Sequence, residues 1–513
     1  MDLDVHGCRP KVLKAATNGK LPTAQETVVS LRQRATSGVR WSFASHLGRQ
    51  ALQLATTAIL AHLLSPSDYG LLTMALVVTG MIDLFRDLGT SAALVHRKEV
   101  PDSLLSSLFW FNTAIGLCST VLLWLLSPVF SKFYQEPRLE LLLRALAPTF
   151  FISGLGQVQR TLIEKDLGFG QLAKVEISSS VLASIVAISL ALAGAGVWSL
   201  VVQSLITTTA AAAMLFLFLS WKPSWEFRWK EVKSLGHYSL QLTGFNLFNF
   251  LSRNADYLLV GCFLGARDLG YYTMAYRLML YPLQNVSQVI GRVIFPVFSQ
   301  LQEDEARFRR GYLTVAGSIA LVSFPMMVGL MVASDIVVPV VFGPEWEPVI
   351  PLITILALIG LVQSVGTTVG SIYQAKGRTD LMLRWGLFSG CLTVCAFVIG
   401  LRWGTLGVAS AYAVVSLALA IPNFTIPFRL INLRLTELGA HLWRPLVCSL
   451  VMGGLLLLIR PILNTLTPMT SVLVLAVTGI VIYGMTGWSI NREQARQTLA
   501  AAGFKFPIIE RVQ

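Results

Sequence analysis

The sequence predicts an all-α polytopic membrane protein with about fourteen transmembrane helices, organised as two parallel six-helix repeats followed by two C-terminal helices. Three observations predict this fold class: few charged residues, recurrent long apolar segments, and basic loops that alternate along the chain. Charged residues make up 13% of the sequence and hydrophobic residues 54%, whereas a soluble domain carries about 25% charged residues. The composition therefore excludes an ordinary soluble protein.

Apolar segments of about twenty residues recur along the whole chain, and a helix of that length crosses the hydrocarbon core of a bilayer. The loops between the segments are too short to hold a separate soluble domain. The fourteen predicted spans are 39–62, 68–93, 103–126, 139–160, 174–193, 196–220, 236–262, 268–295, 311–333, 348–374, 381–401, 404–427, 444–460 and 468–489.

The distribution of Lys and Arg gives the predicted orientation. When the loops are assigned alternately to the two sides of the membrane, twenty-nine of these residues fall on one side and five on the other. Loops rich in Lys and Arg stay cytoplasmic, so we expect both termini to be cytoplasmic. The same asymmetry accounts for the net charge of +13, and nucleic acid is therefore not an expected partner.

The spans and loops divide the chain into six parts. Residues 1–36 are basic and have no apolar core, which indicates a cytoplasmic arm rather than a cleavable signal peptide. The parts are this arm (1–36), an N-terminal six-helix lobe (37–220), a cytoplasmic linker (221–235), a C-terminal six-helix lobe (236–427), two extra helices (428–490) and a cytoplasmic tail (491–513).

An internal repeat relates the two lobes. Residues 68–75 (DYGLLTMA) and 268–275 (DLGYYTMA) match at five of eight positions, at an offset of 200 residues. At the same offset, polar residues on one face of the first predicted helix correspond to polar residues of the seventh, namely His46 and Asn246, Arg49 and Asn249, Gln53 and Arg253, and Thr56 and Asp256. Each lobe has an even number of spans, so the repeats are expected to be parallel, with the substrate between them.

Polar side chains inside the predicted spans form the candidate binding site. An Arg at the bilayer centre costs at least ~2.5–3.5 kcal/mol to insert, so it usually faces a bundle interior or a wet cavity. Guanidinium groups bind phosphate oxygens through paired hydrogen bonds, which suits a diphosphate, while amides and hydroxyls suit sugars. The candidate cavity residues are Arg49, Gln53, Thr56, Arg144, Asn246, Asn249, Arg253, Asp256 and Arg277.

Some of these residues also have a purely structural interpretation. Arg253 and Asp256 are three residues apart on one predicted helix and could neutralise each other. Arg144 lies close enough to the membrane surface for its side chain to reach that surface. Arg49 and Arg277 have no obvious acidic neighbour on their own helices, which favours a cavity position, although a partner on another helix is possible.

The linker at 221–235 combines Trp221, Trp225 and Trp229 with four basic residues. This composition predicts an interfacial helix on the cytoplasmic leaflet that contacts anionic membrane lipids. A simple aromatic anchor at the membrane surface is the alternative, and it is the interpretation that we favour.

The sequence carries no catalytic motif, no cofactor motif and no metal-ligand spacing. An enzyme such as an oligosaccharide polymerase or ligase would need a sizeable outer loop with functional Arg and His. The longest predicted outer loop, 334–347, contains neither residue type. We therefore expect a transporter rather than an enzyme.

Three segments resemble Wzx-type polysaccharide flippases, which belong to the polysaccharide transport family of the multidrug/oligosaccharidyl-lipid/polysaccharide (MOP) exporter superfamily. Residues 37–75 (SGVRWSFASHLGRQALQLATTAILAHLLSPSDYGLLTMA) and 87–100 (DLGTSAALVHRKEV) resemble the opening of these proteins. Residues 160–177 (RTLIEKDLGFGQLAKVEI) resemble the loop after their fourth helix. The resemblance covers about 37–490 and is closest in the first half.

This resemblance implies fourteen helices in two lobes, a cationic central cavity, and flipping of undecaprenyl-diphosphate-linked oligosaccharides to the periplasmic face of the bacterial inner membrane. The related lipid II flippases have cavity Arg residues on their first and eighth helices, where this chain has Arg49 and Arg277. A polysaccharide polymerase or export machinery is an implied partner. The alternative is a cation-coupled multidrug antiporter of the same superfamily, which resembles twelve helices with acidic rather than basic cavity residues.

Overall fold

The computed structural model describes residues 48–84, 94, 101–166, 168–229, 247–300, 304–463 and 467–490, without the side chains of 284–300 and 462–463. Over these ranges the chain forms helices joined by short turns, with no β-strand. Nine helical segments among the described residues are long and apolar enough to cross a membrane. The all-α, multi-pass fold class is confirmed, while the count of fourteen spans stays a prediction.

The chain divides into two compact units. Unit 1 comprises the residues up to Leu63 together with Ala75–Phe250, and unit 2 comprises Leu64–Met74 together with the residues from Leu251 onward. Helix α3 (Pro66–Asp83) therefore contributes its first half to unit 2 and its second half to unit 1. The six parts proposed from the sequence stay predictions.

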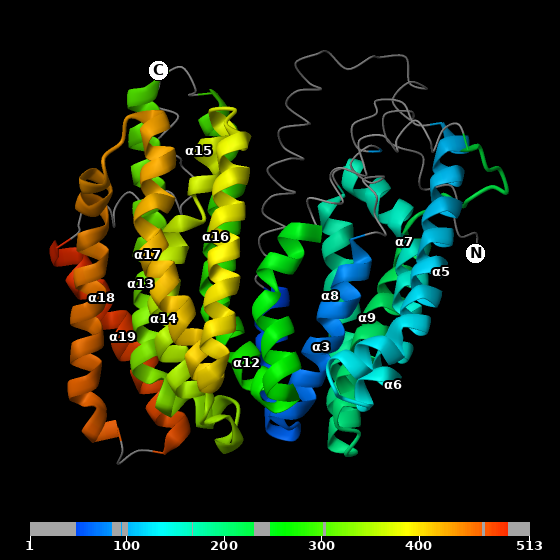
Figure 1. Cartoon of the computed structure of the whole chain (residues 1–513), viewed down its shortest axis with the longest axis horizontal. Coiled ribbons are helices and arrows are strands. Elements are labelled where there is room, and N and C mark those ends of the chain that lie inside the picture. The colour runs from blue at the N-terminus through cyan, green and yellow to red at the C-terminus, as the bar shows by residue number, and fades with distance from the viewer. Residues whose placement is uncertain are drawn as a thin grey trace, which may run out of the picture. The chain divides into compact units, whose positions relative to one another are not determined.

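Unit 1 is built from long helices that run alongside one another (Figure 1). A helix over residues 48–63 comes first. Among the helices that follow, α5 packs along α7 and α8 packs along α9. Their bounds are α5 Asp102–Phe133, α6 Arg138–Leu146, α7 Pro148–Lys165, α8 Phe169–Leu192 and α9 Val197–Phe218.

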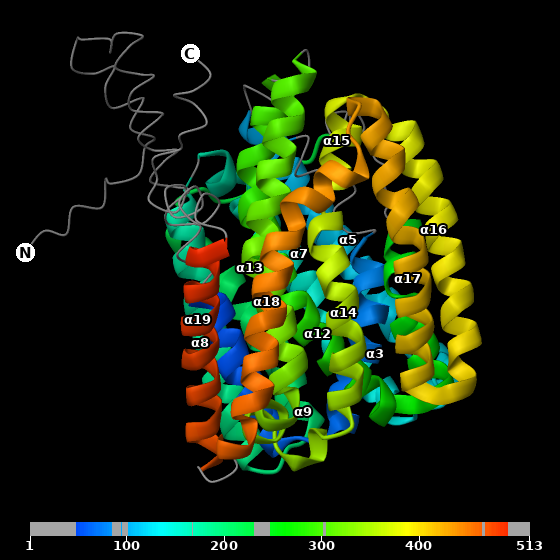
Figure 2. The ribbon, with the colours of Figure 1, turned by 90° about the vertical axis from the view of Figure 1, so that its left-hand side faces the viewer.

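Unit 2 holds the remaining helices. Helix α13 packs on α14 and α18, α16 packs on α17, and α18 lies beside α19 (Figure 2). The bounds are α12 Ala255–Gln300, α13 Glu305–Val341, η2 Pro344–Trp346, α14 Val349–Gly366, α15 Val369–Ala375, α16 Thr379–Gly400, η3 Leu401–Trp403, α17 Gly404–Phe428, η4 Arg429–Ile431, α18 Leu435–Leu463 and α19 Pro468–Ile490.

Helix α12 contains a sharp kink. It includes the end of the predicted span 236–262 and the whole of the span 268–295. The two parts meet at Gly265, whose φ of 88° lies in the region that favours glycine. The loop expected between these spans is thus a kink at a single residue.

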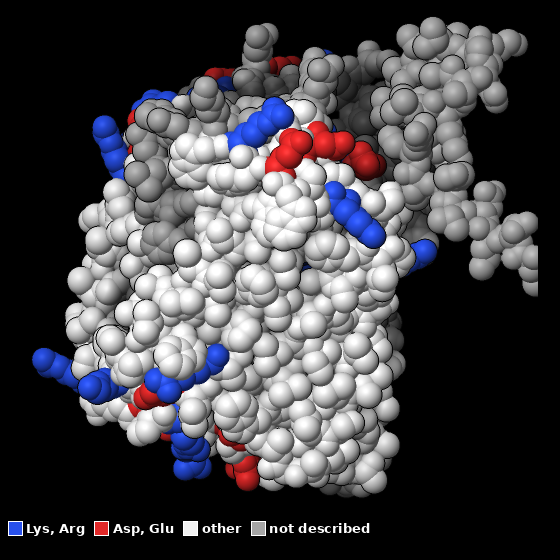
Figure 3. All heavy atoms as spheres, turned by 90° about the vertical axis from the view of Figure 1, so that its right-hand side faces the viewer, with Lys and Arg blue, Asp and Glu red and all other residues white. Residues whose placement is uncertain are grey.

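The outer surface of both units is apolar. Leu217 of α9, Leu458 of α18 and Ile480 of α19 are 84%, 75% and 74% exposed. Figure 3 shows a broad band almost free of charged side chains between two charged borders. A soluble monomer rarely exposes an apolar surface of this extent, whereas the acyl chains of a bilayer would cover it.

The repeated sequence motif forms a close helix crossing inside unit 2. A Cβ atom at Gly70 would overlap the carbonyl group of Ala266, and a Cβ atom at Gly270 would overlap that of Pro66. These contacts are reciprocal, because each partner in one repeat lies 200 residues from its equivalent in the other. Small residues let helix backbones approach this closely. The reciprocity is what a twofold relation between the repeats requires, and it supports the predicted parallel repeat.

The short helix η2 packs directly on this crossing. Trp346 of η2 is fully buried. Its ring centroid lies 5.3 Å from that of Tyr69 and 6.2 Å from that of Tyr271, in edge-to-face geometry in both cases. One side chain therefore holds aromatic residues from both copies of the motif together.

The linker is not helical over residues 221–228, so the predicted interfacial helix is wrong there. The backbone N–H of Ser224 donates to the Ser106 hydroxyl at 3.0 Å, and the Trp110 indole donates to the Ser224 carbonyl at 2.9 Å. The rings of Trp110 and Trp225 stack with their centroids 4.6 Å apart. These side chains of α5 bind backbone groups that an isolated helix would have paired internally.

Candidate functional site

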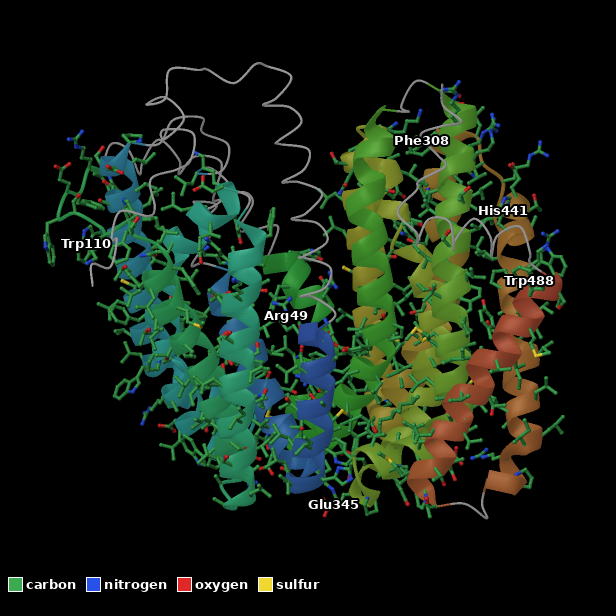
Figure 4. The ribbon with its side chains drawn as sticks, turned by 180° about the vertical axis from the view of Figure 1, so that it is seen from behind. Arg49, Trp110, Phe308, Glu345, His441 and Trp488 are labelled. Atoms are coloured by element: carbon green, nitrogen blue, oxygen red, sulfur yellow. The ribbon has the colours of Figure 1, made fainter. Side chains whose placement is uncertain are left out.

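In unit 1, Arg49 takes part in a charged network between helices. Its Nη1 atom donates to Oε2 of Glu176 on α8 at 2.7 Å. The other oxygen of Glu176 accepts from Nη2 of Arg160 on α7 at 2.9 Å. Arg160 also donates through Nε to Glu164 at 3.1 Å. Arg49 has no acidic partner on its own helix and finds one on α8. Figure 4 shows Arg49 near the start of the described part of the helix over residues 48–63.

The network is half-buried. The side chains of Arg49 and Glu176 are 37% and 26% exposed, and those of Arg160 and Glu164 are 46% and 38% exposed. Ion pairs of this exposure contribute only about 0–1 kcal/mol each, because water screens the charges. The groups are therefore paired, but a competing ion could reach them.

Thr56 lies on the same side of the first helix as Arg49. Its buried hydroxyl donates to the Ser184 hydroxyl of α8 at 3.0 Å. Thr56 is seven residues after Arg49, and Ser184 is eight residues after Glu176, so the two contacts follow the same pair of helices two turns apart. Thr56 therefore joins helices, and its hydroxyl is already occupied.

Two further predicted polar residues of unit 1 are exposed, and a third is not described. Gln53 and Asn249 have exposed side chains. Asn246 lies outside the described residues. The side chains of Gln53 and Asn249 remain accessible to a polar ligand.

Arg144 has a complete set of local partners. Its Nη2 atom lies 2.6 Å from Glu140 Oε1 within α6, and its Nε donates to the Ser127 hydroxyl of α5 at 3.1 Å. The guanidinium carbon lies 4.7 Å above the ring of Trp124. These contacts fix α6 against the end of α5 and favour a structural role for Arg144.

In unit 2, Asp256 is buried and bound by neutral donors. Only 2% of the residue is exposed. Its carboxylate accepts from the backbone N–H of Tyr257 at 2.9 Å and from the Tyr272 hydroxyl at 3.2 Å. Arg253 is exposed and, among the described residues, makes no ion pair with Asp256. The structure therefore does not pair these two charges as the structural interpretation of the sequence proposed.

Tyrosine rings surround this carboxylate. Tyr257 and Tyr272 contact edge to face at 6.2 Å between centroids, and Tyr272 stacks on Tyr276 at 6.0 Å. Tyr276 also faces Tyr412, whose hydroxyl bonds to Gln363. A carboxylate in such a cage has hydrogen-bond donors but no fixed counter-charge within the described part of the chain.

Arg277 lies half-buried on α12 in the same unit. The same helix carries the buried Asp256 and the tyrosines around it. Within the described ranges, no carboxylate forms an ion pair with it. A partly buried guanidinium with no ion-pair partner among the described residues is a good candidate to bind an anion from outside.

The structure thus brings together some candidates and adds residues that sequence reasoning missed. Arg49 and Thr56 both contact α8, and Asp256 and Arg277 lie on the same helix, α12. Glu176 was missed, although it lies inside a predicted span and the criterion that selected Arg49 applies to it equally. The tyrosines carried no comparable signal, because aromatic residues are common in apolar helices.

Long apolar helices with charged groups among them define a multi-pass membrane protein, and solved structures share its fold. The lipid II flippase MurJ in an inward closed conformation aligns with a TM-score of 0.70 at 15% identity, covering 88% of this chain and 99% of MurJ. An inward-facing multidrug resistance MATE family transporter of the MOP superfamily aligns with a TM-score of 0.62 at 16% identity, covering 75% of this chain and 94% of that protein. At these identities the likeness concerns the fold.

The chain belongs to the family of polysaccharide biosynthesis proteins, which matches residues 59–351. The lipopolysaccharide biosynthesis protein WzxC of Escherichia coli K12 is 29% identical over 430 residues, which cover 82% of this chain and 87% of WzxC. The teichuronic acid biosynthesis protein TuaB of Bacillus subtilis 168 is 30% identical over 429 residues, which cover 83% of this chain and 88% of TuaB. The resemblance found in the sequence is confirmed, and the protein is a transporter rather than an enzyme.

Proposed function

We propose that this protein is a flippase that moves undecaprenyl-diphosphate-linked oligosaccharide repeat units from the cytoplasmic to the periplasmic leaflet for lipopolysaccharide or exopolysaccharide biosynthesis. Family membership supports the class of cargo, since one relative is named the succinoglycan biosynthesis transport protein ExoT of Rhizobium meliloti, and another a probable low-salt glycan biosynthesis flippase, Agl15, of Haloferax volcanii. The observation that carries the proposal is the guanidinium of Arg277, which has no ion-pair partner among the described residues of an apolar unit.

In unit 2, Arg277 would bind the diphosphate of the cargo, with Arg253 as a further cation, and in unit 1 Arg49 would offer a second phosphate-binding group. Guanidinium groups suit this role because they remain charged and bind phosphate bidentately. The exposed amides of Gln53 and Asn249 would bind sugar hydroxyls. The lipid tail would stay in the bilayer while the sugars cross in a hydrated cavity, so the protein would shield only the polar part of the cargo.

Transport would proceed by alternating access, with the two repeats rocking against each other. The crossing at Gly70 and Gly270 supports this mechanism, because glycine lets the backbones of the two motif helices meet at a point that a small relative movement can open or close. Closure at this crossing would bar one side of the membrane, and its opening would release the cargo.

Ion coupling would involve Asp256. A buried carboxylate with neutral hydrogen-bond donors can bind a proton or a small cation. The same observation favours the second candidate function, a cation-coupled multidrug antiporter. The two candidates differ in cargo: the antiporter would protect cells from cationic drugs, and the flippase would not.

We place the protein in the bacterial inner membrane with both termini cytoplasmic, because most Lys and Arg fall in loops of one side. A polysaccharide polymerase or export complex on the periplasmic side would consume the cargo. Alkaline phosphatase fused at either terminus should be inactive, because it would lie in the cytoplasm. Activity at both termini would show that the orientation is the opposite of the one proposed.

The test of the function is polymer export in a deletion strain. We expect the strain to accumulate a lipid-linked oligosaccharide on the cytoplasmic face, and the wild-type gene to clear it. Arg277→Ala and Arg49→Ala should fail to clear it at normal membrane levels, while Arg402→Ala, an exposed Arg in η3, should succeed. Normal export in both cavity variants would refute the proposed binding site.

A further inference from the structure

The network in unit 1 has the geometry of an occupied anion site. Two guanidinium groups from different helices, Arg49 and Arg160, converge on the two oxygens of one carboxylate, at 2.7 and 2.9 Å. Each guanidinium uses a single N–H toward Glu176 and keeps other donors. A phosphate group can be bound by the same arrangement, in which two guanidinium groups are directed at one anion.

The network is balanced in charge. It contains two Arg and two Glu side chains, so a phosphate entering it would bring uncompensated negative charge close to Glu176. The phosphate can bind both guanidinium groups only if that carboxylate leaves them. The side chains are all more than a quarter exposed, so water can solvate the displaced carboxylate and the exchange is accessible.

We propose that Arg49 and Arg160 form a two-guanidinium site for the cargo phosphate, and that Glu176 is its resident competing anion, displaced when cargo binds. This inference rests on the proposed function. It adds Arg160 as a binding residue and gives Glu176 a regulatory role. Without cargo, the Glu176 carboxylate holds the two guanidinium groups together. With cargo, it competes for them and lowers the affinity for the phosphate. Cargo release would then be assisted by the return of Glu176 to the two guanidinium groups.

The experiment is equilibrium binding of undecaprenyl diphosphate to the purified full-length protein in nanodiscs. Glu176→Gln should bind about tenfold more tightly, equivalent to about 1.4 kcal/mol, because two half-exposed ion pairs no longer compete with the ligand. Arg160→Ala should weaken binding, as Arg49→Ala does. The matched control is Glu136→Gln, which removes one negative charge of unit 1 from a turn where Glu136 pairs with Arg138 at 3.1 Å, and it should leave affinity unchanged.

Each outcome decides a different claim. Weak binding in Arg49→Ala with no tightening in Glu176→Gln overturns the competing-anion proposal and leaves the flippase intact. Normal binding in Arg49→Ala and Arg277→Ala together refutes the proposed cargo site itself. If Glu176→Gln also binds phosphatidylglycerol or inorganic pyrophosphate about tenfold more tightly than wild type, the proposal is overturned as well. Arg49 and Arg160 would then form a general anion site.

Loss of the bridging carboxylate could also unfold the protein. Glu176→Asp keeps the charge but shortens the reach to both guanidinium groups, so it should fold and bind with intermediate affinity. Affinity no higher than wild type in a folded Glu176→Asp and a folded Glu176→Gln would refute the proposal.

Discussion

Replacing Gly270 by Ala should loosen the crossing of the two motif helices. The added Cβ atom would overlap the Pro66 carbonyl group and lie 3.3 Å from the backbone nitrogen of Gly70. Backbone atoms cannot rotate away as a side chain can, so the helices must separate. Overpacking of this kind costs about 1–3 kcal/mol. If the crossing exists in only one of the two transport states, the change disfavours that state by about 5- to 150-fold.

Two measurements test this prediction. The apparent Tm of the purified variant should fall, by roughly 2–4 °C for each kcal/mol in a unit of this size. A cysteine introduced at Ser65, next to the crossing, should react faster with a polar thiol reagent in the Gly270→Ala background. The control is Gly484→Ala in α19, where a Cβ atom meets nothing within 4 Å. If Gly270→Ala matched this control in both measurements, the reasoning would be refuted.

Three further predictions concern contacts within unit 1. Arg144→Ala should lower thermal stability while polymer export persists, because its partners are local; export lost at normal stability would instead assign Arg144 to the cargo. Thr56→Val and Ser184→Ala should each destabilise the protein by about 0.5–1.5 kcal/mol, with a double variant less costly than the sum; full additivity in thermal unfolding would show that the hydrogen bond contributes nothing. Ser106→Ala should expose the linker around Ser224 to limited proteolysis, and a digestion pattern identical to wild type would contradict the role of that hydroxyl.

Hydropathy predicted the fold class well because the bilayer imposes one physical requirement on every span. About twenty apolar residues must follow one another in the sequence, and that pattern is visible without any tertiary contact. Helix ends were harder to place. The structure extends α13 to Glu305–Val341, whereas the predicted span is 311–333, because residues beyond the apolar core continue the helix.

Partnerships between helices were beyond the reach of the sequence. Arg49 has no acidic neighbour on its own helix, and its partner Glu176 is 127 residues away, so no local spacing predicts the pair. The prediction of a helix in the linker was wrong for a related reason. The Trp and basic residues of the linker suit an interfacial helix, but hydroxyl and indole groups of α5 bind its backbone instead. The offset of 200 residues between Gly70 and Gly270 did predict a symmetric relation, because a repeat records tertiary symmetry in the sequence.

The split membership of α3 has a consequence for biogenesis. Leu64–Met74 belongs to unit 2, although almost all of unit 2 is synthesised after residue 250. The ribosome therefore inserts this half-helix long before its packing partners exist, and Gly70 cannot meet Ala266 until nearly two hundred more residues have entered the membrane. Unit 2 expressed alone from Leu251 would lack the Leu64–Met74 half of α3, which is part of its core. Co-expression with an N-terminal fragment that includes α3 should restore the complete unit.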